Sequence, residues 1–212
     1  LHEGALRLVE AHLPAVSAEK LTAGLLAAQT RLIALGITGW QDALIGDYAG
    51  FPDTRVAYER AIADGTLRVR VRGAQWWQRD RGLEQLDNLI RGRADAAALG
   101  RADRYSLGTV KIMVDGIAEN FTAAMREPYR DACGRDTHNR GKSFISSERL
   151  AEYAIALDRA GFQIHFHALG DRAVHDALNA LAAARTVNGP TDLRHHLAHL
   201  QVVAPGDVSR FA

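Results

Sequence analysis

Two histidines stand at alternate positions of an otherwise apolar stretch, residues 162–173, with the sequence FQIHFHALGDRA. Alternate side chains of a β-strand point to the same face. His165 and His167 are therefore expected on one face together with Gln163, while apolar side chains occupy the other face. Because neutral imidazoles are the commonest zinc ligands, this strand is a candidate for presenting metal-binding groups to the interior of the protein.

A lysine interrupts a second apolar pattern, at residues 109–116. The chain has only three lysines among its 26 lysine and arginine residues, and Lys111 is the one that falls within a strand pattern. The alternation places Lys111 with Met113 and Asp115, opposite the valines and the isoleucine. A buried ammonium ion is costly unless it is paired or chemically altered. Reaction with carbon dioxide would turn the lysine into an anionic carbamate that can bridge two metal ions.

A third strand pattern, at residues 193–203, contributes another inward histidine. One of its faces is expected to carry His195, Leu197, His199 and Gln201. Three successive strands thus each direct one potential ligand inward, namely Lys111, His167 and His199. This convergence predicts a metal site.

Each of these residues also has a simpler interpretation. A single histidine in a strand is more often a hydrogen-bonded interior residue, and His195 and His196 are assigned to that class or to the surface. Lys111 alone could pair with Asp115 or with another nearby carboxylate. The dipeptide at 170–171 is explained by a turn followed by a helix N-cap.

The segments that position these residues alternate between helical and strand signals. Helices are predicted at residues 17–36, 53–65, 83–97, 146–161 and 171–185, with Ser17, Asp53 and Asp171 as N-caps. Strands are predicted at 37–43, 67–74, 109–116, 162–168 and 193–203, and residues 117–144 form a long loop. This order is typical of parallel β/α units, in a doubly wound sheet or a barrel. No glycine-rich phosphate-binding motif follows a strand, so a nucleotide-binding sheet has no support.

The bulk properties exclude several classes of protein. The net charge is +1 and no basic cluster stands out, so neither a nucleic acid nor an acidic membrane surface is an expected partner. No apolar run reaches the roughly 18 residues of a membrane span. The single cysteine, Cys133, excludes an intrachain disulfide and favours a reducing compartment, so a cytoplasmic location is expected. The chain begins at Leu1 without a methionine, which suggests a segment of a longer protein.

Five motifs resemble, in order and wording, those of amidohydrolase family 3, which includes the N-substituted formamide deformylases. These motifs are GITGWQDA, YERAIADGTLRVRV, VKIMVDGIAENFTAAMREPY, GFQIHFHALGDRAVHDALNA and RHHLAHLQVVAPGDVSRFA, and together they span essentially the whole chain. The resemblance implies a (β/α)8 TIM barrel of the metallo-dependent hydrolase type. Because a complete barrel needs about 250 residues, residues 1–212 are expected to form one partial catalytic domain with about five of the eight units. A β-sandwich domain and the barrel ends would lie outside this sequence.

The resemblance also implies a ligand set. Lys111 matches the metal-binding lysine of the fourth barrel strand, His167 the histidine of the fifth and His199 that of the sixth. His165 lies beside a ligand without matching one. The family's first-strand His-x-His and eighth-strand aspartate have no counterpart here, so the general base is expected beyond the C-terminus and no catalytic residue within this segment.

The function implied is hydrolysis of carbon–nitrogen bonds, amide-like but not peptide, in a small-molecule substrate by a metal-activated water. The cofactor would be a divalent metal, with Zn²⁺ favoured, as one or two ions. The candidates for contacting the substrate or supporting the ligands are Asp115, Asn120, Tyr129, His165, Asp171 and Arg172. The loop at 117–144 is a candidate lid or a surface excursion. A homodimer stays open as a partner arrangement.

Two other functions remain open. A catalytically inactive barrel would serve as a binding or regulatory protein, or the chain would be a fragment with an incomplete site. A different barrel enzyme would use Lys111 as a Schiff-base amine, since a desolvated lysine is a nucleophile. Borohydride trapping with a carbonyl substrate separates the last alternative, because a carbamate is not trapped.

Overall fold

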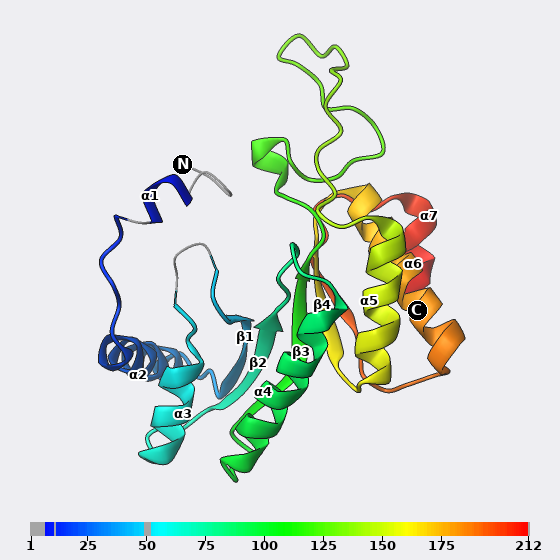
Figure 1. Ribbon diagram of the computed structural model, residues 1–212. Coiled ribbons are helices and arrows are strands. Elements are labelled where there is room, and N and C mark those ends of the chain that lie inside the picture. The colour runs from blue at the N-terminus through cyan, green and yellow to red at the C-terminus, as the bar shows by residue number, and fades with distance from the viewer. Residues whose placement is uncertain (1–6, 11, 49–51, 212) are drawn as a thin grey trace. The chain divides into compact units, whose positions relative to one another are not determined.

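The computed structural model describes residues 7–10, 12–48 and 52–211 (Figure 1). The strands in this part of the chain are β1 (Gly39–Ile45), β2 (Arg70–Trp76), β3 (Tyr105–Met113), β4 (Gln163–Ala168) and β5 (His196–His199). The α-helices are α1 (Arg7–Glu10), α2 (Ala18–Ala34), α3 (Arg55–Ala63), α4 (Leu86–Ala98), α5 (Ser147–Arg159), α6 (Asp171–Asn188) and α7 (Pro205–Val208). Short 3₁₀ helices are η2 (Leu83–Gln85), η3 (Ala118–Asn120) and η4 (Ser209–Phe211).

The strands are hydrogen-bonded in chain order, and the chain divides into two compact units. The first unit comprises residues 1–76 and 85–109, and the second comprises residues 77–84 and 110–212, so β3 contributes to both. In the first unit β1 pairs with β2 in parallel, and in the second β4 pairs with β5 in parallel. Parallel neighbours joined through helices are the arrangement that the alternating sequence signals predicted.

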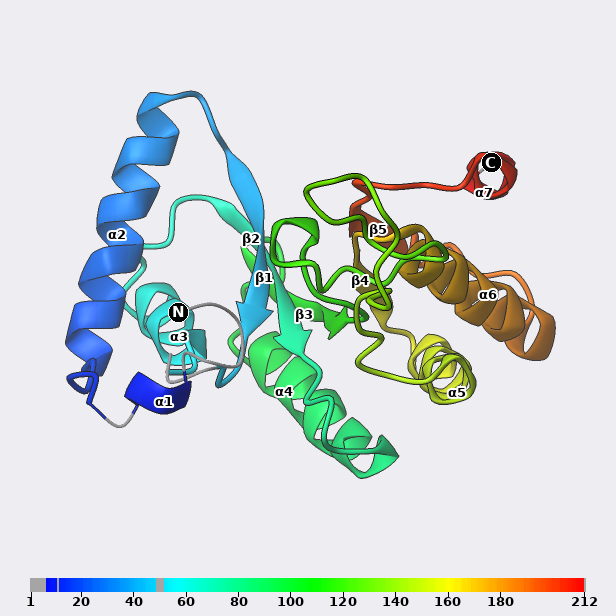
Figure 2. The same ribbon diagram turned by 90° about the horizontal axis from the view of Figure 1, so that it is seen from above.

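The first unit is built around a cluster of buried apolar side chains. Helices α2 and α3 lie along the same side of β1 and β2 (Figure 2). Ser17 caps α2, because its side chain accepts the Lys20 N–H, and Gly36 with a φ of 80° follows the helix end. The cluster comprises Ile45, Tyr58, Ala61, Leu67, Val69, Val71, Ala96, Tyr105 and Leu107.

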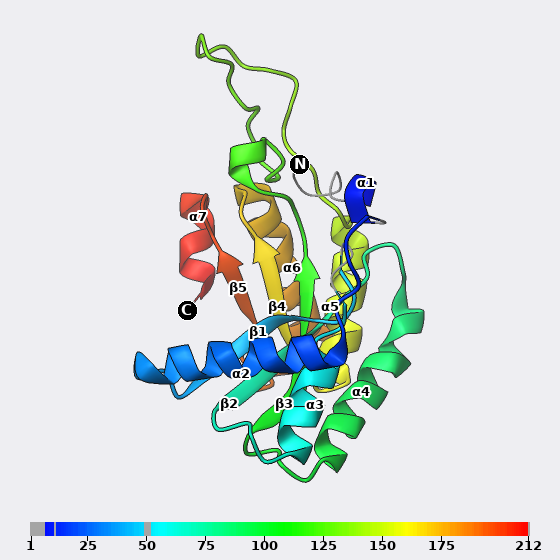
Figure 3. The same cartoon turned by 90° about the vertical axis from the view of Figure 1, so that its left-hand side faces the viewer.

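The second unit packs two helices against a strand whose apolar face is fully buried. Helices α5 and α6 lie side by side against β4, and β3, β4 and β5 run in the same direction (Figure 3). The four apolar side chains of the β4 region all have 0% exposure: Phe162, Ile164, Phe166 and Ala168. The alternation predicted for this strand is therefore confirmed. Full burial of each phenylalanine contributes about 1.5–3 kcal/mol, which is why this face turns toward the helices.

Strand β3 begins earlier than predicted, at Tyr105 and not at residue 109. Its buried apolar residues change parity along the strand, from Tyr105 and Leu107 to Val110 and Ile112. The change falls at Gly108 and the residue after it, and a glycine inside a strand commonly marks such an irregularity. The first half was missed because a period of two cannot be followed across that change.

Two predicted N-caps are wrong by one residue. Thr54 occupies the N-cap of α3, while Asp53 lies one residue earlier and accepts the Arg55 N–H. Gly170 occupies the N-cap of α6, and Asp171 is its first helical residue. The reason at α6 is that the carbonyl of Ala124 accepts the Arg172 N–H, which a capping side chain would otherwise serve.

Residues 117–144, the long loop predicted from the sequence, extend beyond the ends of β3 and β4 (Figure 1). The loop contains η3 and an isolated antiparallel bridge between Arg130 and Asp136. We call it the 117–144 loop. None of the helices in the described part of the chain is long and apolar enough to span a membrane.

The close approach of Gly170 to the 117–144 loop gives a prediction about stability. A Cβ at position 170 would collide with the backbone of Ala124, including its carbonyl oxygen. Gly170→Ala should therefore destabilise the protein by about 1–3 kcal/mol, the usual cost of overpacking. Gly24→Ala is the matched control, because position 24 is exposed on α2 with nothing within 4 Å of the new methyl group. Thermal unfolding should show a lower Tm for the first variant and an equal or higher Tm for the second. A Tm of Gly170→Ala equal to that of the parent would contradict the contact between position 170 and the Ala124 backbone.

Candidate functional site

The predicted polar residues of β3 and β4 are buried on the face of these strands opposite α5 and α6. Lys111, His165 and His167 are 6%, 7% and 8% exposed, and all belong to the second unit. Their burial next to one another is unusual, because lysine and histidine are costly to bury as cations. For Lys111 and His165, burial favours the neutral form.

Lys111 and His165 form a hydrogen-bonded pair. The distance between Lys111 Nζ and His165 Nε2 is 2.9 Å. Burial lowers the pKa of Lys111 to about 8, and burial together with the nearby Lys111 charge lowers the pKa of His165 to about 3. His165 is thus a neutral acceptor at physiological pH, and a minority of Lys111, larger than for an ordinary lysine, exists as the free amine. An amine, unlike an ammonium ion, can react with carbon dioxide.

The alternative pairing of Lys111 with Asp115 is not what the structure shows. Asp115 is fully buried, and its carboxylate accepts the backbone N–H groups of Ala124, Leu169 and Gly170 at 2.9, 3.0 and 2.9 Å. Burial raises the pKa of Asp115, while these hydrogen bonds act in the opposite direction. The carboxylate is therefore occupied by three backbone N–H groups and does not pair with Lys111.

His167 is oriented by the chain that follows β3. Its Nε2 lies 3.0 Å from the carbonyl oxygen of Gly116, so Nε2 carries the proton and donates. Asp115 Oδ1, at 3.7 Å from the same nitrogen, favours that tautomer. The nitrogen with a lone pair for ligation is then Nδ1. The His167 ring lies 4.6 Å from the ring of His199, centroid to centroid.

His199 reaches His167 by a route that strand alternation does not predict. The register of β4 and β5 pairs His165 with His196 and Phe166 with Leu197. The expected shared face of His195, Leu197, His199 and Gln201 is therefore wrong. His199 has a φ of 83° and Leu200 a φ of 49°, and these left-handed conformations bring the His199 ring to His167. Each such residue costs of order 1–3 kcal/mol, a strain that clusters at functional sites.

His196 belongs to this neighbourhood and was missed from the sequence. Its ring lies 4.3 Å from the ring of His165, and burial lowers the pKa of both His196 and His199. The parallel register would have revealed it, since His196 stands opposite His165. The lysine–histidine cluster consists of Lys111, His165, His167, His196 and His199.

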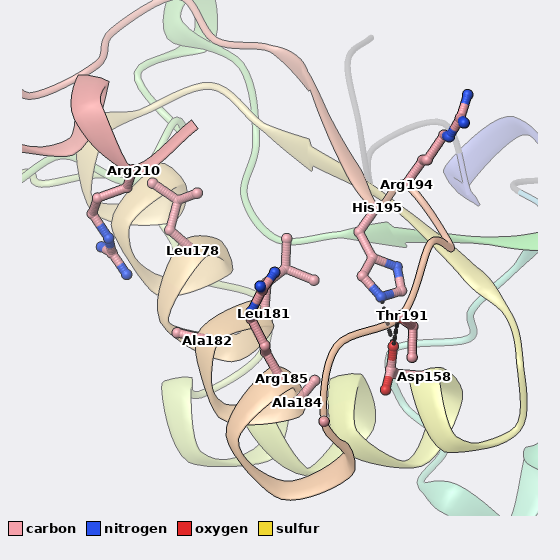
Figure 4. Close-up of a pocket in the computed structure, with 11 residues that line it drawn as sticks. Asp158, Leu178, Leu181, Ala182, Ala184, Arg185, Thr191, Arg194, His195 and Arg210 are labelled. Carbon is pink, nitrogen blue, oxygen red and sulfur yellow. Dashed lines mark hydrogen bonds and ion pairs between the residues drawn. The ribbon is translucent and has the colours of Figure 1, made fainter. Parts of the chain in front are cut away.

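His195, in contrast, is the interior hydrogen-bonded histidine expected from the sequence. Its Nδ1 accepts the Ile164 N–H at 3.0 Å, and its Nε2 lies 2.9 Å from Asp158 Oδ1. Figure 4 shows this pair at one side of a pocket of about 480 Å³ between α6 and the segment before β5. The pair joins α5 to β5 on the helix side, away from the lysine–histidine cluster.

The other candidates from the sequence are engaged in and around the 117–144 loop. Tyr129 donates its hydroxyl to the Ala123 carbonyl at 2.9 Å, and Asp171 accepts the Arg126 N–H at 2.9 Å. The side-chain nitrogens Asn120 Nδ2 and Arg172 Nε are buried without a hydrogen-bond partner. Tyr129 and Asp171 thus hold the loop in place.

The cluster brings together nitrogen donors of the kind that zinc sites use. Within residues 7–10, 12–48 and 52–211, no three His, Cys, Asp or Glu side chains are grouped closely enough to hold a metal ion. The adjacent rings of His167 and His199, with Lys111 nearby, match zinc's preference for imidazole nitrogen but fall short of four ligands. The donor chemistry fits a divalent metal that has further ligands.

Comparison with known proteins identifies the family. Residues 1–212 match the amidohydrolase family over their whole length. The chain belongs to the amidohydrolase family. Its relatives include the exoenzymes regulatory protein AepA of Pectobacterium carotovorum subsp. carotovorum, 30% identical over 84% of this chain and 35% of that protein. The putative amidohydrolase YtcJ of Bacillus subtilis (strain 168) is 27% identical over 96% of this chain and 35% of its own length.

Two solved structures share the fold. An uncharacterized metal-dependent hydrolase from Pyrococcus furiosus matches with a TM-score of 0.70 and 21% identity, over 100% of this chain and 40% of that one. A second from Pyrococcus horikoshii OT3 gives a TM-score of 0.66 at 21% identity, over 92% of this chain and 35% of that one. The chain spans about a third of the length of the curated relatives AepA and YtcJ. Its α/β architecture is consistent with part of a TIM barrel.

A second cluster of charges ties the 117–144 loop to α6 and to the segment of α7 and η4. Asp207 is 3% exposed and lies 2.9 Å from His175 Nδ1, 2.9 Å from Arg210 Nη1 and 3.1 Å from Arg126 Nη2. Burial raises the pKa of Asp207, but hydrogen bonds from His175 and Arg210 outweigh it and hold the pKa below its usual value. The carboxylate is thus more stable ionised in the folded state.

Asp207→Asn should therefore lower stability in a pH-dependent way. Because the folded-state pKa lies below the unfolded value of about 3.9, the stabilisation is complete above that value and is lost as the pH falls through the folded-state pKa. At pH 7 the variant should lose about 1–3 kcal/mol, the cost of removing a charged hydrogen-bond partner. At low pH the difference from the parent should shrink.

Thermal or urea unfolding at pH 7 and below pH 4 measures this difference. Asp192→Asn is the control. Asp192 and Arg194 form an ion pair whose side chains are 82% and 79% exposed, so the substitution should have no measurable effect on stability. A loss for Asp207→Asn that is the same at both pH values would show that the charge is not what stabilises this contact.

Proposed function

We propose that the protein is a metal-dependent hydrolase that cleaves amide-like, non-peptide carbon–nitrogen bonds of small molecules. The observation that carries the proposal is the approach of the His199 ring to His167, beside the buried Lys111, in a chain of the amidohydrolase family. Lys111 and His167 are buried polar side chains, which is costly in a role that is only structural, and the exposed His199 turns its ring toward His167.

Lys111, His167 and His199 would hold a divalent metal, for which we favour Zn²⁺. His167 would bind through Nδ1, because its Nε2 proton is donated to the Gly116 carbonyl. Burial lowers the pKa of His199, which keeps its imidazole neutral and able to ligate. Lys111 would bind as its carbamate, which its neutral amine can form. A bound metal of this kind polarises a carbonyl group and lowers the pKa of a coordinated water to about 7.

The remaining residues of the cluster would prepare the ligands. His165 holds Lys111 Nζ at 2.9 Å and stays neutral, so it adds no positive charge next to a metal. The ring of His196 covers His165 at 4.3 Å. A complete site needs further ligands and a general base, and an aspartate from another barrel strand is proposed for that role.

A regulatory role without catalysis is the second candidate. It is favoured by one observation, the 30% identity with a relative named as an exoenzymes regulatory protein. A regulator of this kind would keep the fold and bind a small molecule on the same face without turning it over. Metal binding together with turnover in the complete protein would exclude it.

Alanine variants of the proposed ligands test the function. In the complete protein, Lys111→Ala and His199→Ala should each lose metal affinity and amide-hydrolysis activity at least about 100-fold, since even residues behind metal ligands are worth up to that factor. His138→Ala is the matched control, because His138 is an exposed histidine of the 117–144 loop. Metal content by mass spectrometry and a screen of small amides measure both effects.

The outcomes separate the candidates. If Lys111→Ala kept the metal content and activity of the parent, the assignment of Lys111 would be wrong. If Lys111 were instead trapped by borohydride with a carbonyl substrate, the protein would be a Schiff-base enzyme.

A further inference from the structure

Three separate segments of the second unit meet at one buried carboxylate, that of Asp115. Its Oδ2 accepts the N–H of Ala124 in the 117–144 loop and the N–H of Gly170 before α6, both at 2.9 Å. Its Oδ1 accepts the N–H of Leu169, just after β4, at 3.0 Å. The end of β3, the loop and the β4–α6 turn are thus joined through a single side chain with 0% exposure.

The backbone around this carboxylate is in direct contact. The carbonyl of Ala124 accepts the Arg172 N–H, so Ala124 bonds Asp115 on one side and the first turn of α6 on the other. A Cβ at Gly170 or at Gly141 would collide with the backbone of Ala124 or Ala123. Gly141 also has a φ of 74°, which side chains rarely adopt. The start of the 117–144 loop, at Ala123 and Ala124, therefore packs against Gly141 near the end of the loop and against Gly170, with no space for a side chain at either glycine.

The same carboxylate acts on His167. Its Oδ1 lies 3.7 Å from His167 Nε2, the nitrogen that donates to the Gly116 carbonyl at 3.0 Å. Gly116 follows Asp115 directly, and Leu169 is two residues after His167. The position of Asp115 consequently determines both the acceptor of the His167 proton and the path of the strand that carries His167.

We propose that Asp115 is a positioning residue that locks the 117–144 loop to the β4–α6 turn and thereby holds His167 in its Nε2–H tautomer. The part of this inference that concerns metal ligation rests on the proposed function, and the locking of the loop does not. Asp115 contacts neither the substrate nor the metal in this role. It is completely buried, and its three hydrogen bonds are made to backbone N–H groups.

A carboxylate is required because all three partners are donors. Asparagine has nearly the same shape, but one of its two terminal atoms is itself a donor. Asp115→Asn would therefore set an NH₂ group against at least one backbone N–H, and a buried donor without an acceptor is costly. The substitution removes the function of the side chain and changes its volume very little.

The experiment compares Asp115→Asn with Asp131→Asn in the complete protein. Asp131 is the matched control: it lies in the same loop and also accepts two backbone N–H groups, those of Cys133 and Arg135 at 2.8 and 2.9 Å, but only within its own turn. Hydrogen exchange is followed by mass spectrometry at Ala124, Leu169 and Gly170. Affinity for Co²⁺ is followed by its visible absorption, and kcat and KM are measured separately.

Asp115→Asn should exchange about tenfold faster or more at all three amides, the factor expected when a charge-assisted hydrogen bond is lost. Its Co²⁺ affinity should fall about 10- to 100-fold, as for other groups that orient a histidine ligand, and kcat should fall with little change in KM. Asp131→Asn should change exchange only near Cys133. Parent-like exchange in Asp115→Asn would overturn the inference.

Two further results keep the inference separate from the proposed function. Faster exchange with unchanged Co²⁺ affinity, in a protein whose parent binds Co²⁺, would overturn the effect on His167. If the parent bound no metal, the proposed function would fail, while the exchange data alone would decide whether Asp115 locks the loop.

Should Asp115→Asn not fold, the parent is used by itself. Its amides at Ala124, Leu169 and Gly170 should then exchange at one common rate, slower than that of Cys133, and three unrelated rates would overturn the inference.

Discussion

The complete burial of one face of β4 by α5 and α6 is the constraint on which the second unit depends. With Phe162, Ile164 and Phe166 at 0% exposure, every polar group of this strand must point the other way. Pleated geometry leaves no third direction. A shift of β4 by one residue would exchange its two faces. The position of the lysine–histidine cluster is therefore set by the burial of the apolar residues as well as by the chemistry of the cluster.

Crowding five basic side chains on one face has an electrostatic result. Burial is the main reason that Lys111, His165, His196 and His199 all have lowered pKa values, and for the three histidines the charge of Lys111 acts in the same direction. Neutral nitrogen with a lone pair is what a metal ion requires. Burial thus favours the neutral forms on which the proposed ligation depends, and the nearby Asp115 accepts backbone N–H groups and not the Lys111 ammonium.

Much of this arrangement could be predicted from residue patterns, and the failures have physical causes. The alternation in 162–168 and the cap at Ser17 are local properties, and both were predicted correctly. The approach of His199 to His167 depends on left-handed backbone conformations at His199 and Leu200, which the residue types at these positions do not predict. His196 depends on the register between two strands, and the displacement of Asp171 from the N-cap depends on a carbonyl 47 positions earlier in the chain, that of Ala124. Such partners become visible only when distant segments are placed together. The amidohydrolase family follows from the sequence, whereas the ligand roles stay predictions.

The manner in which the 117–144 loop is attached bears on how such a protein could change its preferences over evolutionary time. The loop is fastened near its two ends, mainly by hydrogen bonds to main-chain groups and by glycine contacts at 141 and 170. Hydrogen bonds to main-chain groups do not depend on which side chains the rest of the loop carries. Mutations along the exposed tip could therefore accumulate without loosening the anchorage, and new recognition surfaces could be sampled while the lysine and histidines keep their places.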